Sequence, residues 1–326
     1  MYILSLMLLL AVASSVMAAD WRKQDSGSLA WLQAVEFIDA DRGFAAGSNG
    51  TLLATQDGGA SWRKLRVPTA DTIRDVYFAD ISNGWMLCDR GRTAGGKNPA
   101  YLMRTIDGGK TWSVIELAAS RERFSRMFFT PTGRLLVGEG GVVAWLPEDG
   151  KPEARHWLPI KFRILDGEMV SGSRMILAGG GGTLIFSDDN GRSWQNGVFT
   201  SSRPEQKLNS IFFANENAGW TAGAAGMIFF TGDRGRTWRP QSSGTTAEIL
   251  DIGFFDGMNG FAVGDGGMIL GTHDQGKTWM FEKSGTPHRL ERIAFEGDRA
   301  IAVGFGGTII TAALPDRQFM QGRKQQ

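Results

Sequence analysis

Three residue types that build many functional sites are scarce in this chain of 326 residues, which has one cysteine, three histidines and three tyrosines. The single cysteine, Cys88, lies in an apolar run, which excludes a disulfide framework and a cysteine-based metal site. The histidines show neither H-x-x-x-H nor H-E-x-x-H spacing, and no serine sits in a G-x-S-x-G motif. We therefore expect neither a metal ion nor another cofactor.

An excess of charge of one sign is also lacking, since 35 Lys and Arg residues stand against 34 Asp and Glu residues. No strongly charged tail points to nucleic acid, and nucleic acid is not expected as a partner. After residue 19, no apolar run approaches the roughly 20 residues that a membrane-spanning helix needs. We therefore expect no transmembrane helix in the chain once a signal is removed.

Only the first 19 residues combine an apolar core, from Ile3 to Val12, with the small residues Ala18 and Ala19. This pattern predicts a signal peptide over residues 1–19, cleaved just before Asp20, and a periplasmic or lumenal mature protein. The residues before the apolar core include no Lys or Arg, which leaves a retained N-terminal anchor as the alternative.

Glycine and tryptophan are instead abundant, with 45 and 11 residues, and a repeated motif contains both. The pattern [ST]-x-D-x-G-x-[ST]-W, called the Asp-box here, occurs five times. Its aspartates are Asp57, Asp107, Asp189, Asp233 and Asp274, and its tryptophans are Trp62, Trp112, Trp194, Trp238 and Trp279. The carboxylate can accept hydrogen bonds from turn amides, the glycine supplies a positive φ, and the tryptophan covers the hairpin. We therefore assign these residues a structural role.

Each Asp-box follows three apolar strands separated by glycine-containing turns, and a fourth strand begins at its tryptophan. Four antiparallel strands make one blade of a β-propeller. Two further units have worn boxes: one ends near Trp157, and one stops after three strands and can take its fourth from Trp21 onward. The sequence therefore predicts an all-β fold over residues 20–315, a seven-bladed β-propeller with four-stranded antiparallel blades whose last blade is closed by the N-terminal strand. Residues 316–326 are expected to form a polar C-terminal tail.

The Asp-box resembles that of sialidases and related glycosidases. That family has an F/Y-R-I-P motif before its first box, an arginine triad and a late tyrosine nucleophile. Here the segment FRIL at 162–165 lacks the proline and follows two boxes, while Tyr77 and Tyr101 both lie in early blades. We therefore expect no enzyme activity. A carbohydrate-active propeller, either a sialidase-like hydrolase or a lectin, is the alternative function.

Basic residues gather on the face opposite the Asp-boxes, where a turn of the second blade is longer than the repeat requires. The loop residues are Arg90, Arg92 and Lys97 in that turn, and Arg121 and Arg123 in the next link between blades. Alignment of the blades puts Asp75, Arg126, Ser210, Asp251 and Arg292 at one position of the innermost strands, with Arg74 and Arg163 at the position before it.

We expect the aligned residues to form a charged ring near the mouth of the central channel. Together with the loop residues they would make an Arg-rich patch for carboxylate-bearing protein segments, because guanidinium groups pair bidentately with carboxylates. The alternative is a set of solvated surface arginines balanced by neighbours such as Glu122 and Glu139.

Tandem G-[FW]-x-x-G-x-x-G-x-[IL] blocks followed by T-x-D-G-G-x-T-W, as at Gly84–Trp85 and Thr105–Trp112, resemble the photosystem II stability/assembly factor family. The resemblance extends from Trp21 to Pro315, with departures in the worn third box and the long second-blade loop. It implies a non-catalytic periplasmic or lumenal scaffold that helps a membrane protein complex or its subunits assemble, with an arginine patch in that role. A monomer is expected.

Overall fold

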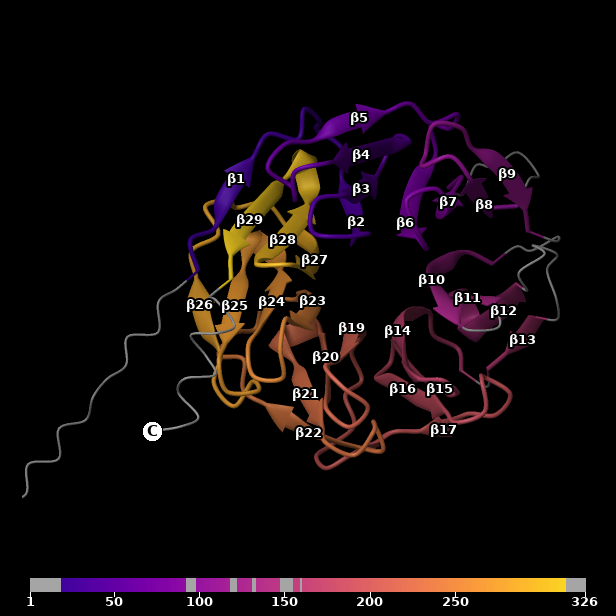
Figure 1. The fold of residues 1–326 in the computed structure, drawn as a ribbon. Coiled ribbons are helices and arrows are strands. Elements are labelled where there is room, and N and C mark those ends of the chain that lie inside the picture. Colours follow the sequence, from indigo (N-terminus) through magenta and orange to yellow (C-terminus); the bar gives the residue numbers. More distant parts are fainter. Residues whose placement is uncertain are drawn as a thin grey trace, which may run out of the picture.

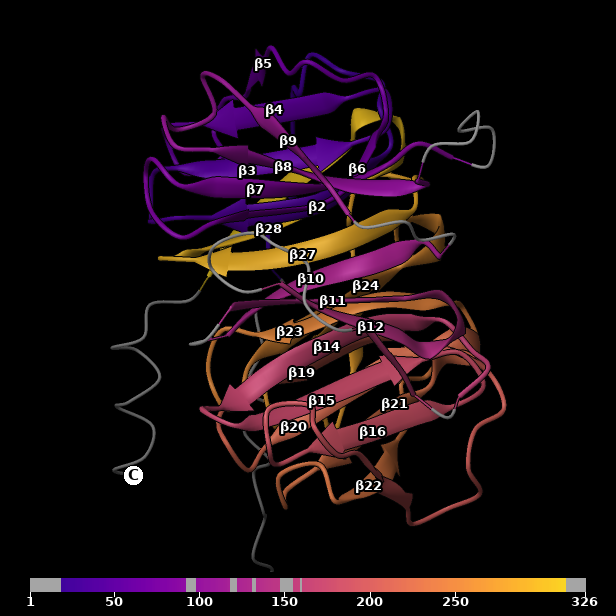
Figure 2. The ribbon, with the colours of Figure 1, turned by 90° about the vertical axis from the view of Figure 1, so that its right-hand side faces the viewer.

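Seven sheets surround a central axis in the computed structural model, which describes residues 19–91, 98–117, 122–130, 133–146, 155–158 and 160–314 (Figure 1). In five of the sheets the first strand along the chain lies innermost and the last lies at the rim. Seen from the side, the strands run between the two faces of the ring (Figure 2). The predicted seven-bladed β-propeller is confirmed.

The first three blades follow one another along the chain. Blade 1 contains β2 (Leu32–Phe37), β3 (Gly43–Gly47), β4 (Thr51–Thr55) and β5 (Arg63–Leu65). Blade 2 contains β6 (Thr72–Phe78), β7 (Gly84–Asp89), β8 (Ala100–Thr105) and β9 (Ser113–Glu116). Blade 3 contains β10 (Phe124–Thr130), β11 (Gly133–Gly138), β12 (Val142–Leu146) and β13 (Arg155–Trp157).

Blade 5 departs from the four-strand rule. Blade 4 contains β14 (Ile164–Ser171), β15 (Arg174–Gly179), β16 (Thr183–Ser187) and β17 (Gln195–Asn196). Blade 5 contains β19 (Leu208–Phe213), β20 (Gly219–Gly223), β21 (Ile228–Thr231) and β22 (Thr237–Gln241). The link between these blades adds a fifth strand, β18 (Val198–Phe199), which pairs in parallel with β22 and covers the outer edge of the sheet.

The last blade is assembled from both ends of the described chain. Blade 6 contains β23 (Ile249–Phe254), β24 (Gly260–Gly264), β25 (Ile269–Thr272) and β26 (Met280–Glu282). Blade 7 contains β27 (Leu290–Glu296), β28 (Arg299–Gly304), β29 (Ile309–Ala313) and, from the other end, β1 (Arg22–Gln24). Because β1 pairs antiparallel with β29, the predicted closure by the N-terminal strand is confirmed, and β29 has no open edge along this pairing.

The hydrophobic core lies between blades rather than at the axis. Seven clusters of buried apolar residues each join two neighbouring sheets. Trp220 of blade 5, for example, is fully buried and stacks on Phe254 of blade 6 with 3.7 Å between ring centroids. Trp21 packs edge-on against Phe261 of blade 6 at 5.2 Å, so the closing strand also contributes to the core.

The G-x-x-G turns between the second and third strands require their last glycine. Gly50 has a φ of +58°, and a Cβ atom there would lie 2.0 Å from the carbonyl oxygen of Thr69 in the next link. Four such turns form short 3₁₀ helices, η1 (Glu139–Gly141), η2 (Ala224–Gly226), η3 (Asp265–Gly267) and η4 (Phe305–Gly307). No helix in the described ranges has the length and apolar character needed to cross a membrane.

Of the two incomplete boxes, the one that closes the last blade has its tryptophan at the Asp-box position, whereas the one predicted to end near Trp157 does not. Trp21 directly precedes Arg22, which pairs with Thr311 just as Arg63, after Trp62, pairs with Ala54. Trp157 instead pairs with Val142 at the far end of its outer strand, so it does not occupy the Asp-box position of blade 3. The residues predicted as signal peptide, apart from Ala19, and those predicted as the C-terminal tail lie outside the described ranges.

Candidate functional site

The Asp-boxes form five closely similar hairpins on one face. In the first, Asp57 accepts hydrogen bonds from the Ser61 amide at 2.8 Å, the Ser61 hydroxyl at 2.5 Å and the Thr55 hydroxyl at 2.7 Å. The Trp62 indole donates to the carbonyl of Gly59 at 3.1 Å, which fixes the ring over the turn. The same carboxylate contacts recur at Asp107, Asp189, Asp233 and Asp274.

These hydrogen bonds hold the box carboxylates in their charged form. Donation from Ser61 and its counterparts lowers the pKa of Asp57, Asp107 and Asp189 to about 2. An aspartate whose pKa lies so far below neutral pH, and whose lone pairs accept hydrogen bonds from its own turn, is poorly suited to act as a general acid. The geometry of the boxes is that of turn stabilisation.

Both tyrosines in the described ranges are committed to packing or internal hydrogen bonds. Tyr77 stacks on Phe129 with 3.5 Å between ring centroids. The Tyr101 hydroxyl donates to Asp71 at 2.7 Å and lies 2.6 Å from the Thr69 hydroxyl, and burial raises its pKa. Among the described residues, no group of three His, Cys, Asp or Glu side chains could hold a metal ion.

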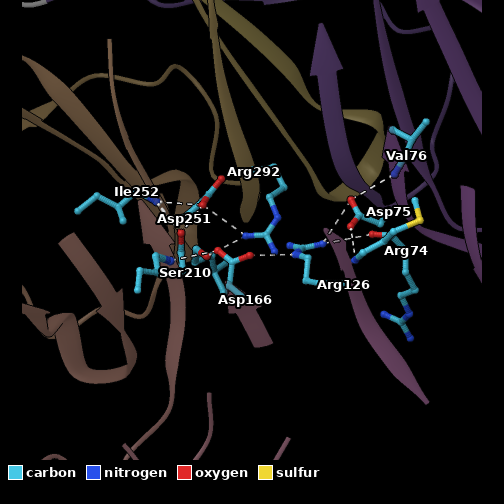
Figure 3. Close-up of polar contacts among 12 residues, drawn as sticks. Arg74, Asp75, Val76, Arg126, Asp166, Ser210, Asp251, Ile252 and Arg292 are labelled. Atoms are coloured by element: carbon cyan, nitrogen blue, oxygen red, sulfur yellow. Dashed lines mark hydrogen bonds and ion pairs between the residues drawn. The ribbon is translucent and has the colours of Figure 1, made fainter. Parts of the chain in front are cut away.

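A ring of side chains lines the channel directly after a β-bulge in each innermost strand. All seven inner strands shift register at the same place, so the residues that follow the bulge are equivalent. In blade order they are Ala34, Asp75, Arg126, Asp166, Ser210, Asp251 and Arg292. Figure 3 shows the polar members turned toward one another.

One arrangement of an aspartate and an arginine occurs twice in this ring. Asp75 of blade 2 accepts a hydrogen bond from the backbone N–H of Met127 in blade 3 at 3.0 Å, while Arg126 donates back to the carbonyl of Arg74 at 3.4 Å. Their charged groups lie 3.9 Å apart. These contacts satisfy backbone groups of the innermost strands, whose inner edges have no partner strand.

Blades 6 and 7 repeat the arrangement (Figure 3). Asp251 accepts from the N–H of Ile293 at 2.9 Å, and Arg292 donates to the carbonyl of Leu250 at 3.4 Å. Arg292 and Asp251 form an ion pair at 3.4 Å, and the Ser210 hydroxyl of blade 5 adds a hydrogen bond to Asp251 at 2.6 Å.

The fourth blade contributes a ring residue that the sequence alignment missed. Asp166 accepts from the N–H of Ile211 at 3.1 Å and pairs with Arg126 at 3.3 Å. Burial, together with nearby Asp166, raises the pKa of Asp251 to about 7. Burial opposes the charge of Arg126, but Asp75, Asp166 and Asp251 outweigh it and raise the pKa of the guanidinium. The ring is therefore an internally compensated network, and Arg126 is not available to a partner.

Two further carboxyl groups were not predicted. Glu36 and Glu168 lie two residues after the ring position in blades 1 and 4, and Glu168 accepts from the N–H of Phe213 at 2.8 Å. Burial raises the pKa of both to about 8. Near pH 7 both are therefore protonated to a much greater extent than an ordinary glutamate.

A funnel of about 200 Å³ leads to this ring from the face opposite the Asp-boxes. It is lined by six basic residues, Arg74, Arg126, Arg163, Lys207, Arg289 and Arg292, and by two acidic residues, Asp89 and Glu291. Because the ring aspartates already pair with Arg126 and Arg292, the rest of the lining has an excess of two basic residues over acidic ones. We call this lined opening the basic funnel.

The basic residues around the funnel differ in part from the predicted patch. Arg163 does not stand next to the ring, as predicted, but three residues before it, level with Arg123, Lys207 and Arg289. The prediction named neither Lys207 nor Arg289 as a partner-binding residue. Arg163 pairs with Glu139 at the rim.

The predicted loop residues divide into two groups. Arg74 and Arg123 converge on Asp89, at 2.9 Å and 3.1 Å. Arg90 turns away from the funnel, since it lies 3.8 Å from the ring centroid of Tyr101 and pairs with Glu116 on the outer strand at 2.6 Å. The remaining predicted residues, Arg92, Lys97 and Arg121, lie outside the described ranges.

Comparison with known proteins identifies the family. The family model described as photosynthesis system II assembly factor YCF48 matches residues 13–121, 60–162, 118–231 and 231–313. The chain belongs to this family. Two solved structures of YCF48 align over nearly the whole chain. YCF48 bound to a D1 peptide has a TM-score of 0.73 and 20% identity, and the alignment covers 91% of this chain and 97% of that one. YCF48 from Cyanidioschyzon merolae has a TM-score of 0.74 and 20% identity, with coverage of 91% and 99%. At this identity, the likeness shows a shared fold.

Curated relatives match over shorter segments. Photosystem II assembly protein Ycf48 of Thermosynechococcus vestitus is 27% identical over 170 residues, which are 51% of this chain and 46% of that protein. Photosystem II stability/assembly factor HCF136 of Arabidopsis thaliana is 36% identical over 86 residues, or 25% of this chain and 19% of that protein. The chain thus spans about half, or less, of the length of these two relatives.

Proposed function

We propose that this Ycf48-family propeller is a non-catalytic assembly factor that acts on the exported side of a membrane. It holds a carboxylate-bearing segment of a membrane protein complex, or of one of its subunits, at the basic funnel. The names of the relatives support the class of function, and the structural relative with a bound D1 peptide supports a peptide as ligand. The observation that carries the proposal is the excess of basic residues around the funnel.

Three basic residues of the funnel have the exposure that a docking site needs. The side chains of Arg163, Lys207 and Arg289 are 38%, 44% and 34% exposed. Each pairs with an acidic neighbour, but exposed pairs of this kind contribute only about 0–1 kcal/mol, so a ligand carboxylate can join or replace the neighbour. Guanidinium groups add bidentate geometry, which favours carboxylates over other acceptors.

The test uses a change at these three residues that leaves the buried ring intact. We expect the triple variant Arg163→Gln, Lys207→Gln, Arg289→Gln to bind a fluorescein-labelled Gly/Ser decapeptide ending in three aspartates at least about tenfold more weakly than the unaltered protein. Fluorescence anisotropy at low and high salt measures the affinity, and the difference should shrink as salt screens the charges.

A matched control removes three exposed basic residues elsewhere. The variant Arg63→Gln, Lys64→Gln, Lys110→Gln makes the same change in net charge on the outer strand and Asp-box turn. It should bind the peptide within about twofold of the unaltered protein. Equal losses in both triple variants would show a non-specific charge effect, and no loss in the funnel variant would refute the proposed site.

A further inference from the structure

An exposed apolar surface borders the basic funnel where blades 7 and 1 meet. It consists of Leu29, Trp31 and Phe305, which are 91%, 38% and 52% exposed, and we call it the apolar shelf. The Trp31 and Phe305 rings meet edge to face with centroids 6.1 Å apart, and His288 supports Phe305 from the side at 5.9 Å.

The shelf is joined to the funnel by a hydrogen bond. The Trp31 indole donates to Glu291 at 2.8 Å, and Glu291 in turn forms an ion pair with Arg289 at 2.8 Å. Both Glu291 and Arg289 line the funnel. The orientation of the exposed indole is therefore fixed relative to the basic groups.

The repeat itself does not call for apolar residues at these places. Trp31 stands three residues before the ring position, where the other six blades have Thr72, Arg123, Arg163, Lys207, Glu248 and Arg289. Phe305 opens a G-x-x-G turn whose counterparts in the described turns of the same length begin with Ser48, Glu139, Gly180, Ala224 and Asp265. The other blades adopt the same fold with polar or small residues at these two positions. The shelf therefore has no evident role in folding.

We propose that the apolar shelf is the second half of a two-part peptide site. It takes a large aliphatic or aromatic side chain of an extended segment whose carboxylates lie in the basic funnel. This inference rests on the proposed function and specifies the partner further, as an acidic peptide with an apolar anchor. Exposed apolar surface with a polar border is typical of interaction sites, and aromatic residues are frequent anchors there.

Charge favours a peptide over a second copy of the chain as the occupant. A symmetric contact through this face would bring two basic funnels together, which like-charge repulsion opposes. An acidic segment meets the same lining with opposite charge. The basic excess beside the shelf thus selects the kind of partner whose apolar residue it would bind.

The experiment compares peptides that differ in one residue. The parent is the Gly/Ser decapeptide ending in three aspartates, and in three derivatives one residue located two, four or six positions before the first aspartate becomes Phe. At least one derivative should bind about tenfold more tightly than the parent, because the shelf shields its ring from water. The double variant Trp31→Thr, Phe305→Ser should lose this gain while binding the parent peptide within about twofold.

Two further variants keep the test decisive. Leu29→Ser changes a side chain that is 91% exposed, so it should lower the gain without affecting the melting temperature. Phe281→Ala removes a ring that is 62% exposed from the outer strand of blade 6 and should leave the gain unchanged.

The proposed role of the apolar shelf is refuted if no Phe derivative binds more tightly than the parent peptide, or if the gain in affinity survives in the double variant. Sedimentation that shows a dimer lost in the double variant would assign the shelf to a second copy and would also overturn the proposal. Failure of the proposed function would look different, since the parent peptide would then bind the Arg163, Lys207 and Arg289 variant as tightly as the unaltered protein.

Discussion

Replacement of Trp21 by alanine tests how strongly the N-terminal strand closes the ring. The Trp21 side chain is 7% exposed, packs against Phe261 at 5.2 Å and donates a hydrogen bond to Glu282 at 2.7 Å. Loss of a buried tryptophan costs about 3–5 kcal/mol, and a hydrogen bond to a charged group contributes about 1.5–3 kcal/mol. Because the site is at the rim and can partly collapse, we expect Trp21→Ala to lower the free energy of unfolding by about 4 kcal/mol.

Urea unfolding followed by circular dichroism measures the change. With an m-value near the upper end of about 1–3 kcal/mol/M, the midpoint should fall by more than about 1 M. Trp21→Phe keeps the contact with Phe261 but loses the indole N–H, so it should cost about 1.5–2 kcal/mol. Lys23→Ala, on the same strand but exposed, should stay within about 0.5 kcal/mol.

A cost below about 1 kcal/mol for Trp21→Ala would refute the closure. It would mean that β29 loses little when β1 detaches, and that the sheet edge of blade 7 is stable on its own. A large cost for Lys23→Ala would point instead to the strand backbone as the main contribution.

Two other predictions concern the channel. Arg126→Met should destabilise the protein by about 3–5 kcal/mol in urea unfolding, because it leaves Asp75 and Asp166 buried without their partner, and a loss under 1 kcal/mol would contradict the compensated ring. Glu36 and Glu168 have folded-state pKa values near 8 against an ordinary 4.5, so they stay protonated in the folded protein while the unfolded chain ionises, and stability should fall as the pH rises from 4.5 to 8. The double variant Glu36→Gln, Glu168→Gln should flatten this fall in the melting temperature, and an unchanged pH profile would contradict the burial of these groups.

The repeat predicts most of the fold because each blade is a local unit. The position of Trp21 before a strand that pairs with β29 follows from the missing fourth strand, since a blade cannot leave its third strand unpaired without an open edge. Trp157 shows that a tryptophan near the expected place does not by itself mark the Asp-box position. In blade 3 the sequence around Asp149 retains only part of the Asp-box motif. Trp157 therefore lies at the end of β13 instead of directly before its start.

The site is predicted less well in blade 4, where the alignment was displaced by two residues along the innermost strand. The alignment matched Arg163 with Arg74, but after the bulge the residue level with Asp75 is Asp166. The basic set of the funnel did carry a signal in the sequence: three residues before the ring, Arg123, Lys207 and Arg289 recur at one position. What sequence could not supply is which of these side chains is exposed, since Arg126 and Arg163 look alike until their burial is known.

The contacts of Asp75 and Asp251 with the backbone of the following blade join some neighbouring blades more closely than others. Each aspartate accepts a hydrogen bond from a backbone N–H of the following blade, at Met127 and at Ile293. The arginine of that following blade donates to a backbone carbonyl of the preceding blade. Blades 2 and 3, and likewise 6 and 7, are thus matched couples, and separating the two members of a couple would break these contacts. Gain or loss of a single blade within either couple would leave a backbone donor and acceptor in the channel without their partners. Duplication of a whole couple would instead supply both the aspartate and the arginine that contact these groups.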